Sequence, residues 1–587
     1  MSVVVLTVVA VAAMATLGIG SARAPRRTSG TAPSLDGVNV VAVLPFFLRG
    51  DTTHAYLREG LADLLSVGLD GLGGLRTVDP YALFAAVART ADAPLDPAHG
   101  RALAARFDAG LYVLGEVMES GGRLHAIASL YDARGALSAR AEASGRADGD
   151  VTELADSLTR RLVAGRYRGP ADELTRIAVL TTSSVPALRA YLQGEQALRA
   201  GRFDAAVMAF QDAVAADSDF ALAYYRLGVA AEWEQLGDLN VASSEHAARL
   251  GHRLSPRTRM LLEASRVHRS GDAARATELY RGILDSYPHD VEATIQYAEL
   301  LSHLGPAISG TPLEAARDQW QKVLAAEPDN RFAIIHLARI AAALGDTATA
   351  ALHTTPAGGD APVGKNRALE LAAWRAILLR RPGAEDSVRA ALLRAGPVAV
   401  ANTVWQILTY SRDLDASERF ARLFGDASVS PPGGRLLMAY VYAARGRFRA
   451  ASAALDSAGG ELDVYAVIHP AVIGLLPLAP RGRLEVLRRR VAAWQPPPRV
   501  PATGTTWETA HFGAEPQVRH YLLGALSAEA GDHEGALRHA AALQRDAVDG
   551  APGAPGLAYT LADELRLRVE LATGRPLAER VPGMRRY

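Results

Sequence analysis

Matching small residues recur in this chain at a spacing of 34 residues. Gly194 and Gly228 are 34 residues apart, and so are Gly271 and Gly305. Repeats of this length are built from two antiparallel helices joined by a short turn, and each repeat must stack on its neighbours to bury its apolar face. We therefore expect a large part of the chain to form an α-solenoid.

The side chains around these glycines indicate the type of repeat. Gly201, Ala206 and Phe210 follow Gly194 at offsets where small residues let two helices approach closely and an aromatic ring fills the space between them. The pattern is typical of tetratricopeptide repeats. The predicted segments of the array are 184–355 (tetratricopeptide repeats), 367–493 (degenerate helical repeats) and 502–587 (C-terminal helical repeats).

Length and charge narrow the classes of function. A chain of 587 residues is too long for a single core, so more than one structural unit is expected. Lys+Arg and Asp+Glu are equal at 63 each, which provides no basic field to attract nucleic acid, and we expect none as a partner. The absence of cysteine excludes disulfides, thiol catalysis and Cys-ligated metals.

The first residues of the chain are almost wholly apolar. The segment from Ser2 to Ala22 is long enough to cross a bilayer as a helix, and no Lys or Arg precedes it. We predict a single-pass membrane anchor at 1–23, with a cleaved signal and a buried helix as alternatives, and a flexible linker at 24–37. The soluble part is expected outside the cytoplasm, although Arg23, Arg26 and Arg27 favour the opposite orientation.

A separate head is predicted at 38–167. The β-branched run Val38–Phe46 and the short segment Leu75–Val78 read as strands, and 56–69 and 81–88 read as helices. A further helix at 98–107 is followed by three strand-like segments (111–117, 124–131 and 136–145) and a closing helix at 151–164. This order implies a mixed sheet with helices packed on it.

Parts of this head resemble a known family. Residues 40–46 (VVAVLPF), 56–63 (YLREGLAD), 75–79 (LRTVD) and 111–117 (LYVLGEV) are similar to the TolB-like N-terminal domain. The resemblance implies a head that precedes tetratricopeptide arrays in bacterial membrane-bound serine/threonine kinases, adenylate cyclases and transcription activators. Kinase signature motifs do not occur in this sequence, so the resemblance implies the sensing or docking half without the catalytic half.

We expect no catalytic residues, no cofactor and no metal site. Residues 359–365 have the glycine and lysine spacing of a phosphate-binding loop, but Asn366 stands where a hydroxyl should follow, and no strand leads in. His533 and His539 lie on different faces of a helix, which does not suit a zinc motif. All fifteen histidines are interpreted as solvated or core residues.

A protein or peptide partner is expected on the concave surface made by the first helix of each pair. The candidate partner-binding residues on the first helices of repeats one and two are Tyr191, Gln193, Arg199, Tyr225, Arg226 and Glu232. The alternative for each is that it only solvates its helix.

The sequence thus predicts an α+β multidomain chain: a small α/β, TolB-like head, an all-α tetratricopeptide-type solenoid and an N-terminal transmembrane helix. The favoured function is a non-catalytic, membrane-tethered interaction scaffold with a sensory or regulatory role. One alternative is an envelope assembly factor. A second is an enzyme with a site in the irregular region 503–515.

Overall fold

The computed structural model describes most of the chain. The described residues are 39–49, 54–87, 95–147, 151–163, 182–199, 201–234, 236–270, 272–305, 311–328, 330–354, 365–380, 382–425, 431–458, 463–476, 478–495, 516–548 and 555–574. The predicted anchor, the linker at 24–37, the phosphate-loop spacing at 359–364 and the region 503–515 lie outside them.

The predicted membrane localisation is corrected by the structure. In the described ranges, no helix combines the length and the apolar character that a bilayer crossing requires. The apolar run of residues 1–23, on which the prediction rested, lies outside those ranges.

The head is a mixed sheet with helices on it, as the order of segments predicted. Its elements are β1 (Val40–Val43), β2 (Phe47–Arg49), α2 (Leu57–Leu69), β3 (Arg76–Thr77), α3 (Pro80–Val87), α4 (Pro97–Ala105), β4 (Leu111–Ser120), β5 (Arg123–Asp132), β6 (Leu137–Arg146) and α5 (Val151–Val163). The strand order is β3-β1-β4-β5-β6, with β1 parallel to β3 and β4, and β4, β5 and β6 antiparallel.

Two short strands, β1 and β2, pair one after the other along β4, and Pro45 lies in the gap between them. Proline has no N–H to donate, so it breaks the ladder at this point. The ring of Phe46 then lies over Gly115, where an added Cβ would be 2.3 Å from the ring. Gly115 thus leaves the room for Phe46 in the head core.

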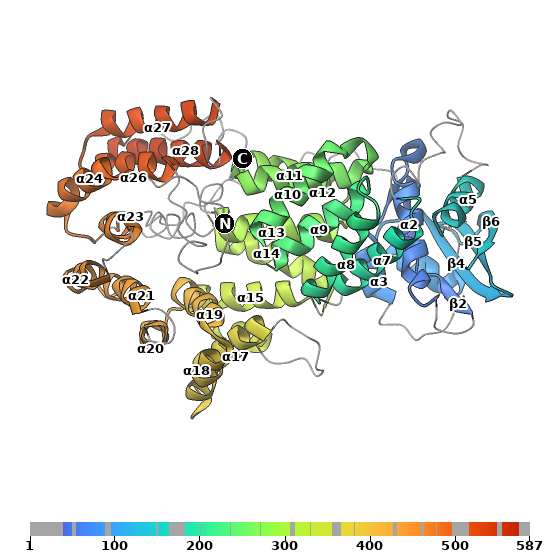
Figure 1. The fold of residues 1–587 in the computed structure, drawn as a ribbon, viewed down its shortest axis with the longest axis horizontal. Helices are drawn as coiled ribbons and strands as arrows, with labels where there is room; N and C mark the ends of the chain where they lie inside the picture. The colour runs from blue at the N-terminus through green and yellow to red at the C-terminus, as the bar shows by residue number, and fades with distance from the viewer. Residues whose placement is uncertain are drawn as a thin grey trace.

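The solenoid consists of paired antiparallel helices (Figure 1). The first half contains α7 (Val185–Arg199), α8 (Phe203–Ala216), α9 (Ala221–Trp233), α10 (Gly237–Arg249), α11 (Pro256–Ser270), α12 (Ala273–Ser286), α13 (Val291–Leu304), α14 (Pro312–Ala326), α15 (Arg331–Leu344) and α16 (Thr347–Thr354). The second half contains α17 (Lys365–Leu379), α18 (Ala384–Ala395), α19 (Pro397–Tyr410), α20 (Leu414–Phe424), α21 (Pro431–Ala444), α22 (Phe448–Ala458), α23 (Asp463–Gly474), α24 (Leu484–Ala493), α26 (Pro516–Glu529), α27 (His533–Val548) and α28 (Pro555–Thr573).

The small residues of the repeat perform the role that their spacing predicted. A Cβ added at Gly194 would lie 2.6 Å from the ring of Phe210, so glycine is what lets α7 and α8 approach. Side-chain caps define helix starts within the array: Asp290 accepts from the backbone N–H of Ala293 at the start of α13, and Asn330 accepts from Ala333 at the start of α15. Close packing at the repeat glycine and side-chain caps at helix starts therefore both contribute to the helical array.

The head and the first repeats share one apolar core, and the C-terminal helices join it. A second core is formed by residues of α15 to α23. Helix α28 packs against α11 and α12, so the end of the array returns to its third pair (Figure 1). At this contact the backbone N–H of Ala273 lies 3.5 Å from the hydroxyl oxygen of Thr560, 287 positions along the chain.

Candidate functional site: the junction of head and solenoid

Three buried aspartates of the head face the first repeats. Asp63 lies within α2, Asp70 follows its end, and Asp79 precedes α3. Their exposed fractions are 6%, 7% and 3%. Buried carboxylates are costly unless they are paired or hydrogen-bonded, so each must find its partners across the junction.

Arg257 of α11 supplies the central cation. Its guanidinium donates to both carboxylate oxygens of Asp290, from Nε at 2.7 Å and from Nη2 at 2.9 Å. The same guanidinium lies 3.6 Å from Asp79 and 3.5 Å from Glu292. Asp79 in turn accepts from the backbone N–H of Val291 at 3.0 Å, which places a head carboxylate on the start of α13.

A second arginine continues the network along the array. Arg226 of α9 lies 3.0 Å from Glu195 of α7 and 3.1 Å from Glu292 of α13, so it links the first, second and fourth pairs. Tyr225 donates its hydroxyl to Glu292. Charged side chains of α7, α9, α11 and α13 therefore form one connected network next to the head, called the charge network below.

A third arginine ties α7 to α2. Arg199 donates to Glu59 at 2.5 Å, and the hydroxyl of Tyr191 donates to Asp63 at 3.2 Å. Gly60 of α2 is packed so closely that an added Cβ would lie 2.9 Å from Leu192. Polar and apolar contacts thus fix the same two helices together.

Burial shapes the electrostatics of these groups. Desolvation raises the pKa of Asp63 and Asp70, against the lowering effect of the nearby arginines, and it raises the pKa of Asp79 to about 7. Neighbouring carboxylates, Asp290 and Glu292 among them, add to the rise in the pKa of Asp79.

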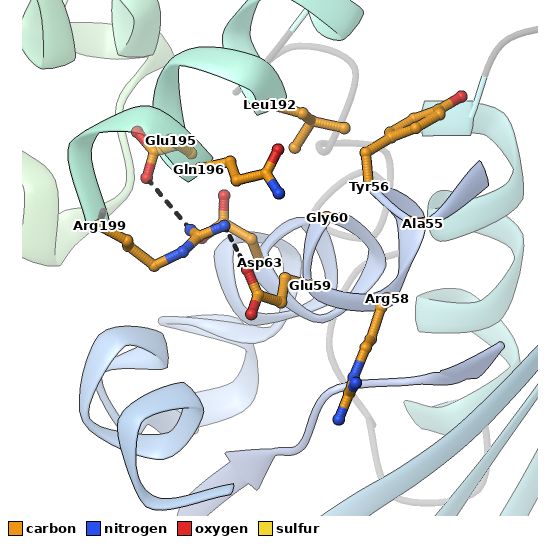
Figure 2. A pocket seen from close by; sticks show the side chains of 10 residues that line it. All are labelled: Ala55, Tyr56, Arg58, Glu59, Gly60, Asp63, Leu192, Glu195, Gln196 and Arg199. Atoms are coloured by element: carbon orange, nitrogen blue, oxygen red, sulfur yellow. Dashed lines mark hydrogen bonds and ion pairs between the residues drawn. The ribbon is translucent and has the colours of Figure 1, made fainter. Parts of the chain in front are cut away.

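A hollow of about 150 Å³ opens beside this network, between α2 and α7 (Figure 2). Glu59, Asp63 and Glu195 line it with carboxylates, and Arg58 and Arg199 line it with guanidinium groups. The remaining lining residues are Ala55, Tyr56, Gly60, Leu192 and Gln196. A space of this size has room for one side chain or a few water molecules.

The six predicted groove residues occupy different surroundings. Tyr191, Tyr225 and Arg226 are buried at 1%, 5% and 5% exposure, with the partners given above. Glu232 is half-buried, Arg199 lines the hollow, and Gln193 is exposed on α7. The structure brings Arg199 to the hollow, places Tyr191 against Asp63, which lines it, and brings Tyr225 and Arg226 to the charge network. A role of these residues in partner binding stays a prediction.

Of the first helices deeper in the array, α11 exposes Arg259 and Glu263, whereas three others are covered. On α9 and α13, and on α15 after Arg331, every residue of described exposure is buried or half-buried. Helix α7 differs, because Arg189, Gln193 and Gln196 are exposed on it. Among the described first helices of the first repeats, α7 therefore offers accessible polar groups beside the hollow, which Gln196 lines.

One group in the described residues has the composition of a metal site. Glu299, His303 and His336 each offer a ligand atom, and these atoms lie within 4.8 Å of one another. From the sequence, no metal site was expected, and every histidine was interpreted as a solvated or core residue. The repeat spacing gave no signal for this group, because 40 residues separate the caps Asp290 and Asn330 of the two helices, whereas 33 separate His303 and His336.

Comparison with known proteins gives only weak similarities. No protein-family model matches the chain, and no curated protein matches it. Matching solved structures include PilW, a type IV pilus biogenesis factor (16% identity, 35% of this chain and 92% of that one, TM-score 0.25). A tetratricopeptide repeat protein from Parabacteroides merdae matches at 11% identity over 49% of this chain and 98% of that one, with a TM-score of 0.25. Yeast Tom70 matches at 12% identity over 66% of each chain, with a TM-score of 0.23.

These TM-scores are too low to carry an argument about function. The tetratricopeptide-like character of the solenoid rests on its paired helices and on the spacing of its glycines. The resemblance of the head to TolB-like domains has no counterpart in these comparisons and stays a prediction.

Proposed function

We propose that this chain is a non-catalytic protein–protein interaction scaffold whose docking surface includes the junction of head and solenoid. The observation that carries the proposal is the exposed face of α7, with Gln193 and Gln196, directly beside the hollow between α2 and α7. Stacked helical repeats commonly serve to bind proteins or peptides along an extended surface.

The charge network supports this location. Arg199, Arg226 and Arg257 connect the head to four successive helix pairs, so the hollow and the α7 face keep a fixed relation to each other. A preorganised surface loses less conformational entropy on binding than a mobile one. A partner side chain that enters the hollow would meet Glu59, Asp63 and Arg199.

The proposal also includes a regulatory role. It rests on the resemblance of residues 38–167 to TolB-like heads, which implies a docking half that works with an output domain. In that role the scaffold would bind an output protein, and the chemistry would belong to that partner.

Site-specific photo-crosslinking in the native host tests the proposal. A photoreactive amino acid in place of Gln193 should give a discrete adduct with a protein partner. The matched control replaces Glu534 on α27, whose side chain is 92% exposed and lies far along the array. Discrete adducts at Gln193 and none at Glu534 would support the junction as a docking surface, and equal patterns or none at Gln193 would refute it.

A further inference from the structure

Two adjacent repeats bring one carboxylate and two imidazoles together on the first helices α13 and α15. Glu299 and His303 are one helical turn apart on α13, and Nε2 of His303 lies 3.0 Å from Oε2 of Glu299. His336 of α15 places its Nε2 at 3.3 Å from Oε1 of the same carboxylate. The carboxylate of Glu299 therefore lies between the two rings.

The hydrogen bond of His336 determines which ring nitrogen carries the proton. Its Nδ1 lies 2.9 Å from the backbone carbonyl oxygen of Phe332. A carbonyl oxygen only accepts, so Nδ1 must carry the hydrogen and donate it. In the neutral ring, Nε2 then presents a lone pair to Glu299 Oε1, and two acceptors face each other at 3.3 Å.

Such a contact between two acceptors is unfavourable unless a proton or a metal cation lies between them. The side chain of His336 is 7% exposed, and its Nε2 makes no hydrogen bond within the described residues. Nδ1 of His303 is likewise buried without a hydrogen-bond partner there. Buried polar atoms without partners are rare in folded proteins and call for an unseen ion or water.

Neighbouring side chains hold His336 in place for ligation. The ring of Trp320 stacks on it at 4.4 Å, and Nε1 of Trp320 donates to the hydroxyl of Ser302 at 3.0 Å. A backbone carbonyl on the far nitrogen and a fixed ring plane are the usual supports of a metal-binding histidine. The nearby cation Arg339 is neutralised by a bidentate pair with Glu370, at 2.6 Å on both sides.

We propose that Glu299, His303 and His336 form a binding site for a divalent first-row transition metal ion, with Zn²⁺ as the best match. Imidazole nitrogens and a carboxylate are preferred ligands of this ion. Tetrahedral Zn²⁺ with bonds of about 2.0–2.1 Å places its ligand atoms roughly 3.3 Å apart. Each histidine lies near that spacing from one oxygen of Glu299, His303 at 3.0 Å from Oε2 and His336 at 3.3 Å from Oε1, and one ligand atom from each of the three residues lies within 4.8 Å of the others.

The position of the site indicates its effect. The three ligands come from α13 and α15, so a bound ion would join two successive repeats of the solenoid. Three protein ligands leave one coordination position for water or for a side chain of a bound partner. The side chain of His303 is 21% exposed and gives the ion a path of entry.

Titration of the purified, chelator-treated full chain with Co²⁺ and Zn²⁺ tests the proposal. We expect one tightly bound ion per chain, a Co²⁺ absorption spectrum of low coordination number, and a Zn²⁺-dependent rise in the thermal midpoint. His336→Gln should weaken binding at least 100-fold, because loss of a ligand exceeds the 10–100-fold effect of losing a supporting group. The matched control His353→Gln, on α16, should bind as the unaltered chain does.

Circular dichroism of each variant separates loss of the site from loss of the fold. If His336→Gln does not fold, His303→Gln, at a more exposed position, replaces it in the same titration. Binding that is unchanged in a folded His336→Gln or His303→Gln variant would overturn the proposal. So would the absence of stoichiometric binding by the unaltered chain.

Discussion

The guanidinium of Arg257 donates two hydrogen bonds, of 2.7 and 2.9 Å, to the carboxylate of Asp290. Both side chains are buried, with exposed fractions of 11% for Arg257 and 0% for Asp290. Asp290 is also the cap of α13, because it accepts from the N–H of Ala293. Since Asp79 of the head lies 3.6 Å from the same guanidinium, one arginine connects a helix cap, a neighbouring repeat and the head.

Removal of this arginine should destabilise the fold strongly. Arg257→Ala leaves Asp290 and Asp79 buried without their cation, and breaking a buried pair in this way costs about 3–5 kcal/mol. The midpoint of denaturant unfolding measures the loss. Arg266→Ala on the same helix is the matched control: Arg266 forms its pairs with Glu245 and Glu263 at 35% exposure, where such pairs contribute about 0–1 kcal/mol. Equal midpoints for the two variants would contradict the role assigned to Arg257.

Close packing at the repeat glycine predicts a second pair of variants. Gly194→Ala forces a methyl group to within 2.6 Å of the Phe210 ring and should cost about 1–3 kcal/mol by overpacking. Gly282→Ala, inside α12, meets open space and should instead stabilise the helix by up to about 1 kcal/mol. Thermal unfolding of both variants distinguishes the signs, and a stable Gly194→Ala would show that α7 and α8 do not depend on that contact.

A buried histidine in the second half of the array predicts a pH dependence. Nδ1 of His469 lies 2.8 Å from the hydroxyl of Tyr440, and burial lowers the pKa of His469 to about 3, from an ordinary value of 6.5. Between these two values the unfolded chain binds the proton more readily than the folded chain. The stability due to neutral His469 is therefore present above pH 6.5 and is lost as pH falls toward 3.

The measurement compares unfolding at two pH values in the unaltered chain and in His469→Gln. Between pH 7 and pH 5 the unaltered chain should lose about 2 kcal/mol more than the variant, from the linkage between the two pKa values. A difference that is absent, or that grows with rising pH, would mean that His469 is protonated or solvated in the fold.

The sequence predicted the elements of the head and the helical array because their signals are local. The β-branched run before Pro45 and the turns at Gly121, Gly122 and Gly135, which all have positive φ, indicated β1, β4, β5 and β6 to within a few residues, whereas the short β2 after Pro45 was not predicted. The glycine spacing likewise predicted the helix pairs. These strand, turn and glycine patterns reflect contacts between residues that are close in the sequence or one repeat apart.

The surroundings of the candidate residues could not be predicted in the same way. Tyr191 lies on the first helix of the array, but its hydroxyl reaches Asp63, 128 positions earlier. A repeat pattern specifies which face of a helix meets the next pair, and it does not specify that a preceding domain covers the first pair. The return of α28 to α11 and α12 depends on the curvature accumulated over the whole array, which no local signal encodes.

The most direct test of the account is a distance measurement between head and solenoid, because the proposed docking surface requires them to act as one body. The chain contains no cysteine, so Arg123→Cys on β5 and Arg275→Cys on α12 would carry the only two spin labels. Glu245→Cys with Arg275→Cys provides a reference pair within the solenoid. We predict a single narrow distance distribution for the head–solenoid pair, as narrow as that of the reference. A broad or multiple distribution for that pair, beside a narrow reference, would contradict the account.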